Sequence, residues 1–269
     1  HKNPILIASI YDVIIGFLIC LKIIYKFKNI KLIHIRGYFP GIIILPILLF
    51  TKIKILFDMR GFWADEKADR GNLSRNSYVY KFLIYLEKIL LKKSFLIICL
   101  TNESIKLLLN KYLFLNKNKF FLIPTCVDTQ KFNLLNKNIN INNKIVFCYL
   151  GSTDTAYDID KVYNIFSKML ICNNKCELRI FTKKKLDLNT IKNKYNFSDS
   201  NIHLKLVDHD LINIELSKCN IGIFYLKDNY SIKASFPTKI GELLASGLPI
   251  LCNDFNDDVT DIINSEKFQ

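Results

Sequence analysis

The chain has 269 residues, of which 50% are hydrophobic and 13% aromatic, so it is not an intrinsically disordered protein. This length accommodates one large α/β domain or two modest ones. The net charge of +14 suggests nucleic acid or anionic lipid as a partner, but the lysines are spread along the chain rather than clustered. We therefore favour a solvated basic surface. A phosphate-binding or membrane-surface role is the alternative, and no nucleic acid partner is expected.

The cysteines and the apolar N-terminal stretch indicate in which cellular compartment the protein is expected. Several of the eight cysteines lie in strand-like runs, such as Cys99 and Cys148, where a free thiol behaves as a small hydrophobic side chain. No cysteine pair has partners at zinc-ligand spacing, so we predict a reduced cytoplasmic protein without a metal site. The apolar stretch 4–21 is interrupted by Asp12, which favours a buried or interfacial helix over a membrane span.

Short β-branched runs alternate with amphipathic stretches along the first half, which is typical of parallel βαβ units. We expect strands at Leu32–Ile35, Ile53–Phe57, Phe95–Leu100 and Lys119–Ile123, and helices at Tyr11–Lys26, Gly41–Phe50, Tyr78–Lys92 and Glu103–Lys111. Thr101 and Asn102 are candidate N-caps of the last of these helices. The pattern predicts a Rossmann-like domain over residues 1–135.

A polar, asparagine-rich stretch then interrupts the pattern, and we interpret residues 136–144 as a linker between domains. A second series follows over residues 145–269. Its expected strands are Ile145–Leu150, Leu178–Phe181, Ile202–Leu206, Ile221–Tyr225 and Pro249–Cys252, and its expected helices are Asp158–Leu170, Asp210–Ser217 and Thr238–Ala245. The sequence thus predicts an α/β protein with two Rossmann-like domains facing across a cleft. The chain starts at His1 and shows no closing element before Gln269, so we expect it to be truncated at both ends.

Residues 235–253, SFPTKIGELLASGLPILCN, combine a helix start with charged groups suited to a nucleoside diphosphate. Pro237 presets the first turn, and Thr238 is expected to satisfy free amides there. An open helix N-terminus beside Lys239 suits a pyrophosphate, because unpaired N–H groups and the helix dipole attract anions. Glu242, one turn further on, can accept hydrogen bonds from two ribose hydroxyls. The alternative is a capped helix that presents Lys239 and Glu242 to solvent.

This string resembles the donor-binding domain of retaining glycosyltransferases with the two-Rossmann-domain GT-B fold, in particular the family-4-like enzymes. Their pattern is Pro-x-Lys, a Glu three residues later, and then Ala-x-Gly-x-Pro. The chain has Pro237, Lys239, Glu242, Ala245, Gly247 and Pro249 at those places. A second match, PTCVDTQKF over 124–132, resembles the family's approach to its interdomain hinge. The resemblance covers residues 32–261 and implies that Lys239 meets the donor diphosphate and that Glu242 binds the ribose.

The chain departs from the family near the donor sugar. The family often carries a second glutamate, which would fall at Ala234 in this sequence. Alanine offers no polar side chain, so the donor-sugar contacts are expected from the backbone amides of Ser235 and Phe236.

The first turn of the second domain is also unusual. Many relatives place an arginine and a lysine there, whereas this chain reads Gly151, Ser152, Thr153. The glycine lets backbone approach a phosphate, and the two hydroxyls can donate hydrogen bonds to phosphate oxygens. An ordinary strand–glycine–helix turn is the alternative.

Charged residues end two strands of the first domain. Asp58, Arg60 and Gly61 follow an apolar run, in a string that resembles one sub-group of envelope-polysaccharide transferases, and Arg36 ends another. Many relatives have His-Gly where Arg60-Gly61 stands, so the resemblance implies that Arg60 acts with Lys239 as a catalytic cation. Arg36 and Asp58 are the acceptor-side or cleft candidates. The alternative is a structural pair of Asp58 with Arg60.

The resemblance implies a hexosyl- or N-acetylhexosaminyltransferase that moves a sugar from a nucleoside diphosphate to a lipid-linked or polysaccharide acceptor, with retention of configuration. The nucleotide sugar is the donor substrate, and no cofactor is expected. Such an enzyme of cell-envelope synthesis is expected in the cytoplasm, with peripheral association at the inner face of the membrane. The alternatives are a truncated, non-catalytic nucleotide-binding relative and a basic protein that binds nucleic acid or membrane.

Overall fold

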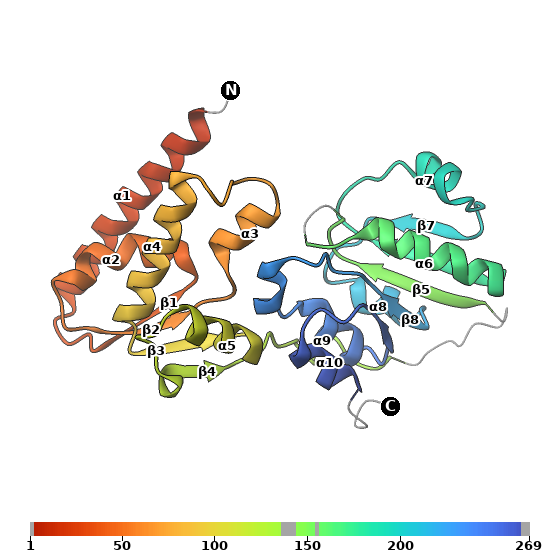
Figure 1. Ribbon diagram of the computed structural model, residues 1–269. Coiled ribbons are helices and arrows are strands. Elements are labelled where there is room, and N and C mark those ends of the chain that lie inside the picture. The colour runs from red at the N-terminus through yellow and green to blue at the C-terminus, as the bar shows by residue number, and fades with distance from the viewer. Residues whose placement is uncertain (1–2, 136–143, 154–155, 265–269) are drawn as a thin grey trace. The chain divides into compact units, whose positions relative to one another are not determined.

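The computed structural model describes residues 3–135, 144–153 and 156–264 (Figure 1). Two compact units divide the chain: unit 1 comprises residues 1–124 and 233–235, and unit 2 comprises residues 125–232 and 236–269. The division therefore falls after Pro124, earlier than the predicted linker 136–144, most of which lies outside the described residues.

Packing explains why the boundary comes early. The Thr125 hydroxyl donates a hydrogen bond to the Phe236 carbonyl at 2.8 Å, and the side chain of Phe132 is fully buried beside the ring of His209. Residues 125–135 thus belong to the second unit through their contacts, although no regular apolar period marks them in the sequence. Composition alone placed the boundary too late.

Unit 1 is a four-stranded parallel sheet whose strands lie in chain order. The strands are β1 (Leu32–Arg36), β2 (Lys54–Asp58), β3 (Leu96–Cys99) and β4 (Phe120–Leu122). The helices are α1 (Asn3–Lys26), α2 (Tyr38–Leu49), α3 (Trp63–Asp69), α4 (Tyr78–Lys93) and α5 (Asn102–Lys111), with the short 3-10 helix η1 (Lys117–Lys119). α2 packs on β1 and α4 packs on β2, while α1 packs on α2. The core between α4 and the sheet contains Phe57, Leu90 and Ile97, all fully buried.

Unit 2 is a five-stranded parallel sheet in the order β7-β6-β5-β8-β9. The strands are β5 (Ile145–Leu150), β6 (Cys176–Phe181), β7 (Ile202–Lys205), β8 (Ile221–Ile223) and β9 (Ile250–Leu251). The helices are α6 (Ile159–Cys172), α7 (Leu188–Tyr195), α8 (Ile212–Leu216), α9 (Thr238–Ala245) and α10 (Asp257–Asn264), and the 3-10 helix η2 (Tyr230–Ala234) precedes α9. The strand order reverses between β5 and β8. This is the Rossmann switch point, where a crevice opens beyond the carboxyl ends of the strands.

Most predicted elements are present, with ends that differ from the prediction by at most three residues. The exceptions are α1, which begins earlier than predicted, and three short helices that were not predicted. The stretch 58–69, where no helix was predicted, contains helix α3, which is fixed by tertiary contacts: the Trp63 ring stacks on Tyr38 and the Tyr80 hydroxyl donates to Asp65 at 2.7 Å. Helices α7 and α10 were not expected either. The predicted N-cap Thr101 is confirmed, since its hydroxyl accepts a hydrogen bond from the Ser104 amide.

The long apolar helix α1 is present and begins earlier than expected. Among the described residues, no helix combines the length and the apolar character needed to cross a membrane.

A buried carboxylate ties three helices of unit 1 together. Glu87 of α4 is 1% exposed and accepts hydrogen bonds from the Tyr38 hydroxyl at 2.8 Å, the Tyr112 hydroxyl at 2.7 Å and the Lys111 ammonium at 3.0 Å. Burial and the neighbouring carboxylate raise the pKa of Tyr38 well above its usual value, so the phenol remains a donor. A buried charge with three donors is well satisfied, and here it links α4 to α2 and to the end of α5.

We expect Glu87→Ala to destabilise unit 1 by ~3 kcal/mol, because it leaves two buried phenols and an ammonium without their acceptor. The only tryptophan of the chain, Trp63, lies in unit 1 and reports its unfolding selectively in a urea titration followed by fluorescence. Lys88→Ala, at the neighbouring exposed position of α4, is the matched control and should leave the midpoint unchanged. Equal midpoints for the two variants would contradict the role assigned to Glu87.

Candidate functional site: a cavity at the switch point of unit 2

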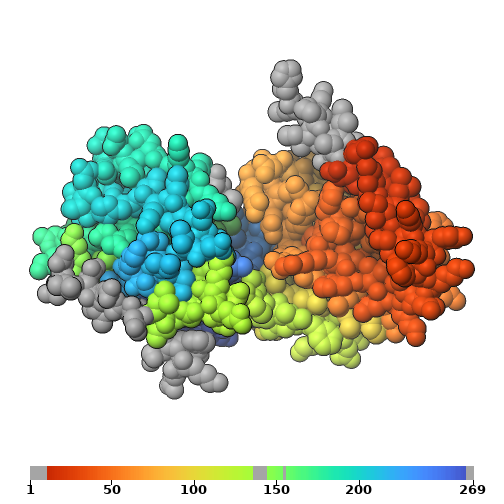
Figure 2. Space-filling model, turned by 180° about the vertical axis from the view of Figure 1, so that it is seen from behind, coloured from red at the N-terminus to blue at the C-terminus, as the bar shows by residue number. Residues whose placement is uncertain are grey.

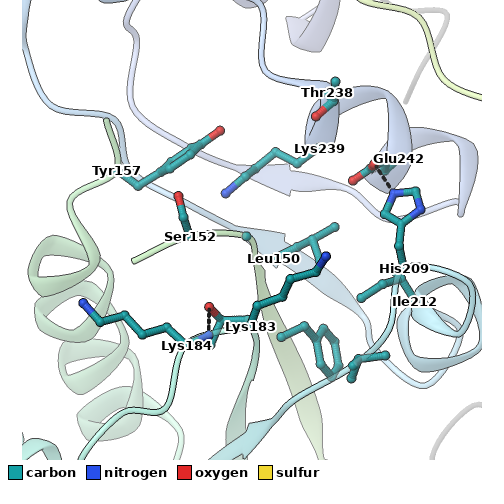
Figure 3. Close-up of a pocket in the computed structure, with 14 residues that line it drawn as sticks. Leu150, Ser152, Tyr157, Lys183, Lys184, His209, Ile212, Thr238, Lys239 and Glu242 are labelled. Atoms are coloured by element: carbon teal, nitrogen blue, oxygen red, sulfur yellow. Dashed lines mark hydrogen bonds and ion pairs between the residues drawn. The ribbon is translucent and has the colours of Figure 1, made fainter. Parts of the chain in front are cut away.

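A cavity of ≈ 700 Å³ opens at the carboxyl edge of the sheet in unit 2 (Figure 3). Its walls come from the ends of β5, β6 and β7 and from α8 and α9, so the Rossmann topology alone brings these segments together. The lining residues are Leu150, Gly151, Ser152, Tyr157, Phe181, Thr182, Lys183, Lys184, Val207, His209, Ile212, Thr238, Lys239 and Glu242. Apolar side chains form one part of this wall and cations another, which suits a ligand with a flat ring and an anionic group.

Helix α9 meets the cavity with its N-terminus. Pro237 occupies the N-cap position and gives no side-chain hydrogen bond. Thr238 is the first helical residue and is exposed, so the prediction that its side chain satisfies the free amides is wrong. The threonine lies one position too late to act as the N-cap. The first amides of α9 therefore stay open to a ligand.

Lys239 is the most unusual residue of the cavity. Its side chain is 4% exposed, and its ammonium has no hydrogen-bond partner among the described residues. Three aromatic rings surround it instead: the ring centroids lie 3.5 Å away for Tyr157, 4.5 Å for Tyr149 and 5.2 Å for Phe224. Ring faces attract a cation but offer it no acceptor. The ammonium is thus held in place and left with unused hydrogen-bonding capacity.

Gly151 gives Lys239 its space. The glycine has φ 121, which an L side chain rarely adopts, and a Cβ built there would lie 3.1 Å from the Lys239 ammonium nitrogen. The turn after β5 therefore requires glycine for two reasons, its backbone conformation and its contact with the lysine. An anion that reached this backbone would also reach the ammonium.

Burial lowers the pKa of Lys239 from 10.5 to about 7. Desolvation is the main cause, and the nearby carboxylate of Glu242 opposes it only in part. The ring faces also favour the charged form, so they offset some of the desolvation. A bound anion would favour the ammonium form by supplying an acceptor, which no described residue supplies.

Glu242 lies one turn after Lys239 and lines the same cavity. Its carboxylate is mostly buried and lies 3.2 Å from the ring nitrogen Nε2 of His209, which is half exposed (Figure 3). The alternative in which Lys239 and Glu242 face solvent as a surface pair does not match this arrangement. His209 was not predicted, because it follows a different strand, β7, and no local motif marks it.

The glycine turn contributes less polar chemistry than expected. Ser152 lines the cavity, whereas Thr153 is half-buried and is not among the lining residues. The Tyr149 hydroxyl donates a hydrogen bond to the Ser152 carbonyl. This bond holds the turn close to the Tyr149 ring. Lys183 and Lys184, which follow β6 in the sequence, supply two cations to the opposite wall (Figure 3).

Ser235 and Phe236 lie outside this cavity wall. Ser235 clusters with unit 1, while Phe236 is buried in unit 2 and its carbonyl accepts the hydrogen bond from Thr125. Ala234, the position of the family's second glutamate, is also buried. The proposed backbone contacts to a donor sugar stay a prediction.

The three candidates of unit 1 end up at the carboxyl edge of its own sheet. Arg36 and Asp58 are opposite one another in the β1–β2 register, and the Arg36 side chain lies 3.7 Å from the Asp58 carboxylate. Arg60 is exposed, in the left-handed backbone region with φ 64. The ion pair that Asp58 forms is therefore with Arg36, not the Asp58–Arg60 pair considered from the sequence. A non-glycine residue at positive φ stores local strain, which is frequent at functional sites.

The cysteines described by the structure are free, and Cys99 and Cys148 are buried in their strands as expected. Within the described residues, no group of three or more His, Cys, Asp or Glu side chains could hold a metal ion.

Comparison with known proteins identifies structures with a similar fold. No protein-family model matches the sequence, and no curated protein matches it. Solved structures do: a glycosyltransferase from Rickettsia africae has 17% identity and a TM-score of 0.63, over 98% of this chain and 66% of that one. A sucrose-phosphate synthase from Thermosynechococcus elongatus has 14% identity and a TM-score of 0.65, over 88% and 59%.

WaaG, a glycosyltransferase involved in lipopolysaccharide biosynthesis, has 13% identity and a TM-score of 0.61, over 84% of this chain and 65% of that one. The chain thus spans about two thirds or less of the length of these structures. They are GT-B glycosyltransferases, and the likeness shows that the two units of this chain have the two Rossmann-like folds of that architecture.

Proposed function

We propose that the chain is part of a glycosyltransferase that binds a nucleoside diphosphate sugar in the cavity of unit 2. One observation carries the proposal: the buried Lys239 ammonium, without a hydrogen-bond partner among the described residues, lies against Gly151 at the switch point of a Rossmann sheet. A pyrophosphate would give the ammonium its acceptors and would meet the open amides of α9 as well.

The rest of the donor fits the remaining walls. Glu242 can accept two hydrogen bonds from a ribose, in which case the carboxylate exchanges His209 for the sugar hydroxyls. The apolar side chains of Val207 and Ile212 offer a surface for a nucleobase, with the main chain around Thr182 beside it. Lys183 and Lys184 add positive charge to the same wall.

In the proposed reaction, the residues of the cavity stabilise the diphosphate leaving group. When the bond between the anomeric carbon and the diphosphate breaks, negative charge develops on the diphosphate oxygen. Lys239 and the α9 amides are fixed before the reaction, so they stabilise that charge without reorganising. Arg60 is the proposed second cation, supported by its exposed, strained position after β2, and Arg36 with Asp58 is the proposed acceptor-side pair.

The acceptor and the stereochemistry belong to the same proposal. The motif over 237–249 supports a retaining enzyme of the family-4-like group, and the likeness to WaaG supports a lipid-linked or polysaccharide acceptor of the cell envelope. Such acceptors are made at membranes, so we place the protein in the cytoplasm at the inner membrane face. The donor is the only small molecule that this scheme requires.

The direct test offers the chain nucleoside diphosphate sugars with uridine, guanosine or adenosine and follows binding by calorimetry and release of nucleoside diphosphate by chromatography. Binding with turnover in the presence of an envelope lipid acceptor supports the transferase. Binding without turnover would favour the non-catalytic nucleotide-binding alternative. Absence of binding to any of these nucleotides overturns the proposal.

Glu242→Gln should weaken binding of the nucleoside diphosphate by about tenfold or more, because a neutral amide replaces two charge-assisted hydrogen bonds to the ribose. The melting temperature should change little, since the carboxylate faces a cavity and a half-exposed histidine. Asp261→Asn, an exposed carboxylate of α10 in the same unit, is the control for lost charge. Unchanged affinity together with a large drop in melting temperature would make Glu242 a structural residue.

Lys239→Met should weaken nucleotide binding yet stabilise the free chain by ~2 kcal/mol at pH 7, because it removes a desolvated ammonium and fills the same space. The pKa of Lys239 is about 7 when folded and 10.5 in its ordinary state, so between these values the unfolded chain binds more protons. The destabilisation is therefore full below pH 7 and fades as the pH rises to 10.5.

Calorimetric melting of unit 2 should thus show the largest difference between Lys239→Met and the wild-type chain near pH 6–7 and a smaller one near pH 10. Lys161→Met, at an exposed position of α6, should show no such pH dependence. If Lys239→Met melts at a lower temperature than the wild-type chain, the ammonium is part of the core rather than a binding group.

A further inference from the structure

The charge of the chain is confined to one unit. Unit 1 contains 21 lysines and arginines against 7 aspartates and glutamates, which gives +14. Unit 2 contains 17 of each and is neutral. The basic character that seemed to be spread evenly along the sequence is therefore a property of unit 1 alone. A charge of this size on a small domain attracts an anionic partner.

Helix α4 presents an aromatic stripe to solvent on this basic unit. Tyr78, Phe82 and Tyr85 follow one another at helical spacing and are 90%, 58% and 59% exposed. The opposite side of the helix is buried through Glu87, Leu90 and Leu91. An aromatic row on the exposed side of this amphipathic helix is not needed for the fold, so it points to a partner.

Lysines run beside the aromatic row. Lys81, Lys88 and Lys92 are exposed and, on a helical projection, lie along one side of the stripe. None of the three forms an ion pair with a carboxylate of the described residues. We call these six residues, Tyr78, Lys81, Phe82, Tyr85, Lys88 and Lys92, the α4 face. It combines apolar rings with unpaired ammonium groups on flexible stems.

Helix α1 adds apolar surface to unit 1. Among its residues from Tyr11 to Lys26 none is fully buried, and it lies on the outside of the unit, on α2, which in turn contacts α4 (Figure 2). Tyr25, Leu18 and Ile14 are more than half exposed, and Lys22 and Lys26 are exposed among them.

We propose that unit 1 binds the interface of an anionic lipid bilayer through the α4 face. Tyrosine and phenylalanine rings are stable at the level of the lipid headgroups, and lysines beside them reach the anionic phosphates while their stems stay in the apolar layer. Each lysine near such a surface adds to the attraction, which is screened by salt. This places the membrane contact on a defined helix.

The lysines of unit 1 argue against two other partners for the α4 face, a second copy of the chain and a nucleic acid. A second copy seated on the α4 face would set lysines of one +14 unit against those of another. Nucleic acid recognition uses arginine heavily, whereas unit 1 carries four arginines, of which Arg36, Arg70 and Arg75 are paired with carboxylates. An anionic bilayer needs only lysine and exposed rings.

The test is co-sedimentation of the whole chain with vesicles, without nucleotide. Vesicles of phosphatidylcholine with 30 mol% (about a third) phosphatidylglycerol should bind the chain at low salt, and pure phosphatidylcholine should bind it at least tenfold more weakly. Phe82→Ser with Tyr85→Ser should reduce partitioning into the anionic vesicles about tenfold or more. Lys81→Glu with Lys88→Glu should abolish it.

Ile171→Ser with Ile214→Ser is the matched control, since both side chains are exposed on helices of the neutral unit 2, and it should bind like the wild-type chain. Trp63 fluorescence shows that each unit 1 variant is folded. Equal vesicle binding by the Phe82 and Tyr85 double variant overturns the proposal, as does binding to a short DNA or RNA duplex, or self-association, in place of vesicle binding.

This inference extends the proposed membrane association of the glycosyltransferase but does not need its donor site. Calorimetry of the double variant with nucleoside diphosphate separates the two ideas. Retained nucleotide binding with lost vesicle binding assigns the two functions to different units. If nucleotides fail to bind while vesicles still bind, the proposed transferase is wrong and the membrane surface stands.

Discussion

The candidate site of unit 2 depends on one close approach, in which the start of helix α9 meets the turn at Gly151, where a Cβ would lie 3.1 Å from the ammonium nitrogen of Lys239. The Gly151 amide still donates to the Phe181 carbonyl at 2.9 Å, and the φ of 121 at Gly151 then turns the chain away from the sheet. Helix α9 must approach closely, and it does so over two further glycines: a Cβ on Gly222 would lie 2.7 Å from Leu243, and one on Gly241 would lie 3.1 Å from Val127. Close packing of α9 thus places a charged side chain where the sheet opens.

Close packing also explains why the lysine is unusual. A lysine at the start of a helix ordinarily reaches solvent, and its stem has enough freedom to do so. Here the approach of α9 to β5 and β8 leaves the ammonium among rings from three separate segments, Tyr149, Tyr157 and Phe224. Its desolvation is a consequence of the tertiary structure, and the fold tolerates it because the rings recover part of the lost solvation.

The sequence predicted the elements that carry strong local signals. β5 and α9 have the expected bounds, since Gly151 ends one and Pro237 and Gly247 bracket the other. Helix α3 was missed, because its seven residues have no helical apolar period and depend on Tyr38 and Tyr80. The unit boundary was missed for a similar reason: residues 125–135 belong to unit 2 through contacts with residues far along the chain, such as that of Thr125 with Phe236.

In the candidate site too, local sequence signals were predictive and tertiary contacts were not. Motif spacing placed Lys239 and Glu242 in one cavity, but it could not reveal that the first is enclosed by rings or that His209 meets the second. The pairing of Arg36 with Asp58 follows from the register of β1 and β2, which no sequence period specifies. The confinement of the positive charge to the first half needed no structure, since a count over the predicted domains 1–135 and 145–269 already separates a basic domain from a nearly neutral one.

A lysine whose pKa is about 7 is also a nucleophile at neutral pH, because much of it carries a free lone pair. Sugars with a free aldehyde condense with such an amine, whereas a sugar joined to a diphosphate through its anomeric carbon has no aldehyde to offer. In the proposed site the intact donor is therefore harmless to Lys239, and the free sugar that accidental hydrolysis releases is not. The rings of Tyr149, Tyr157 and Phe224 cover that amine on their side, so only a molecule that enters the cavity of unit 2 can react with it.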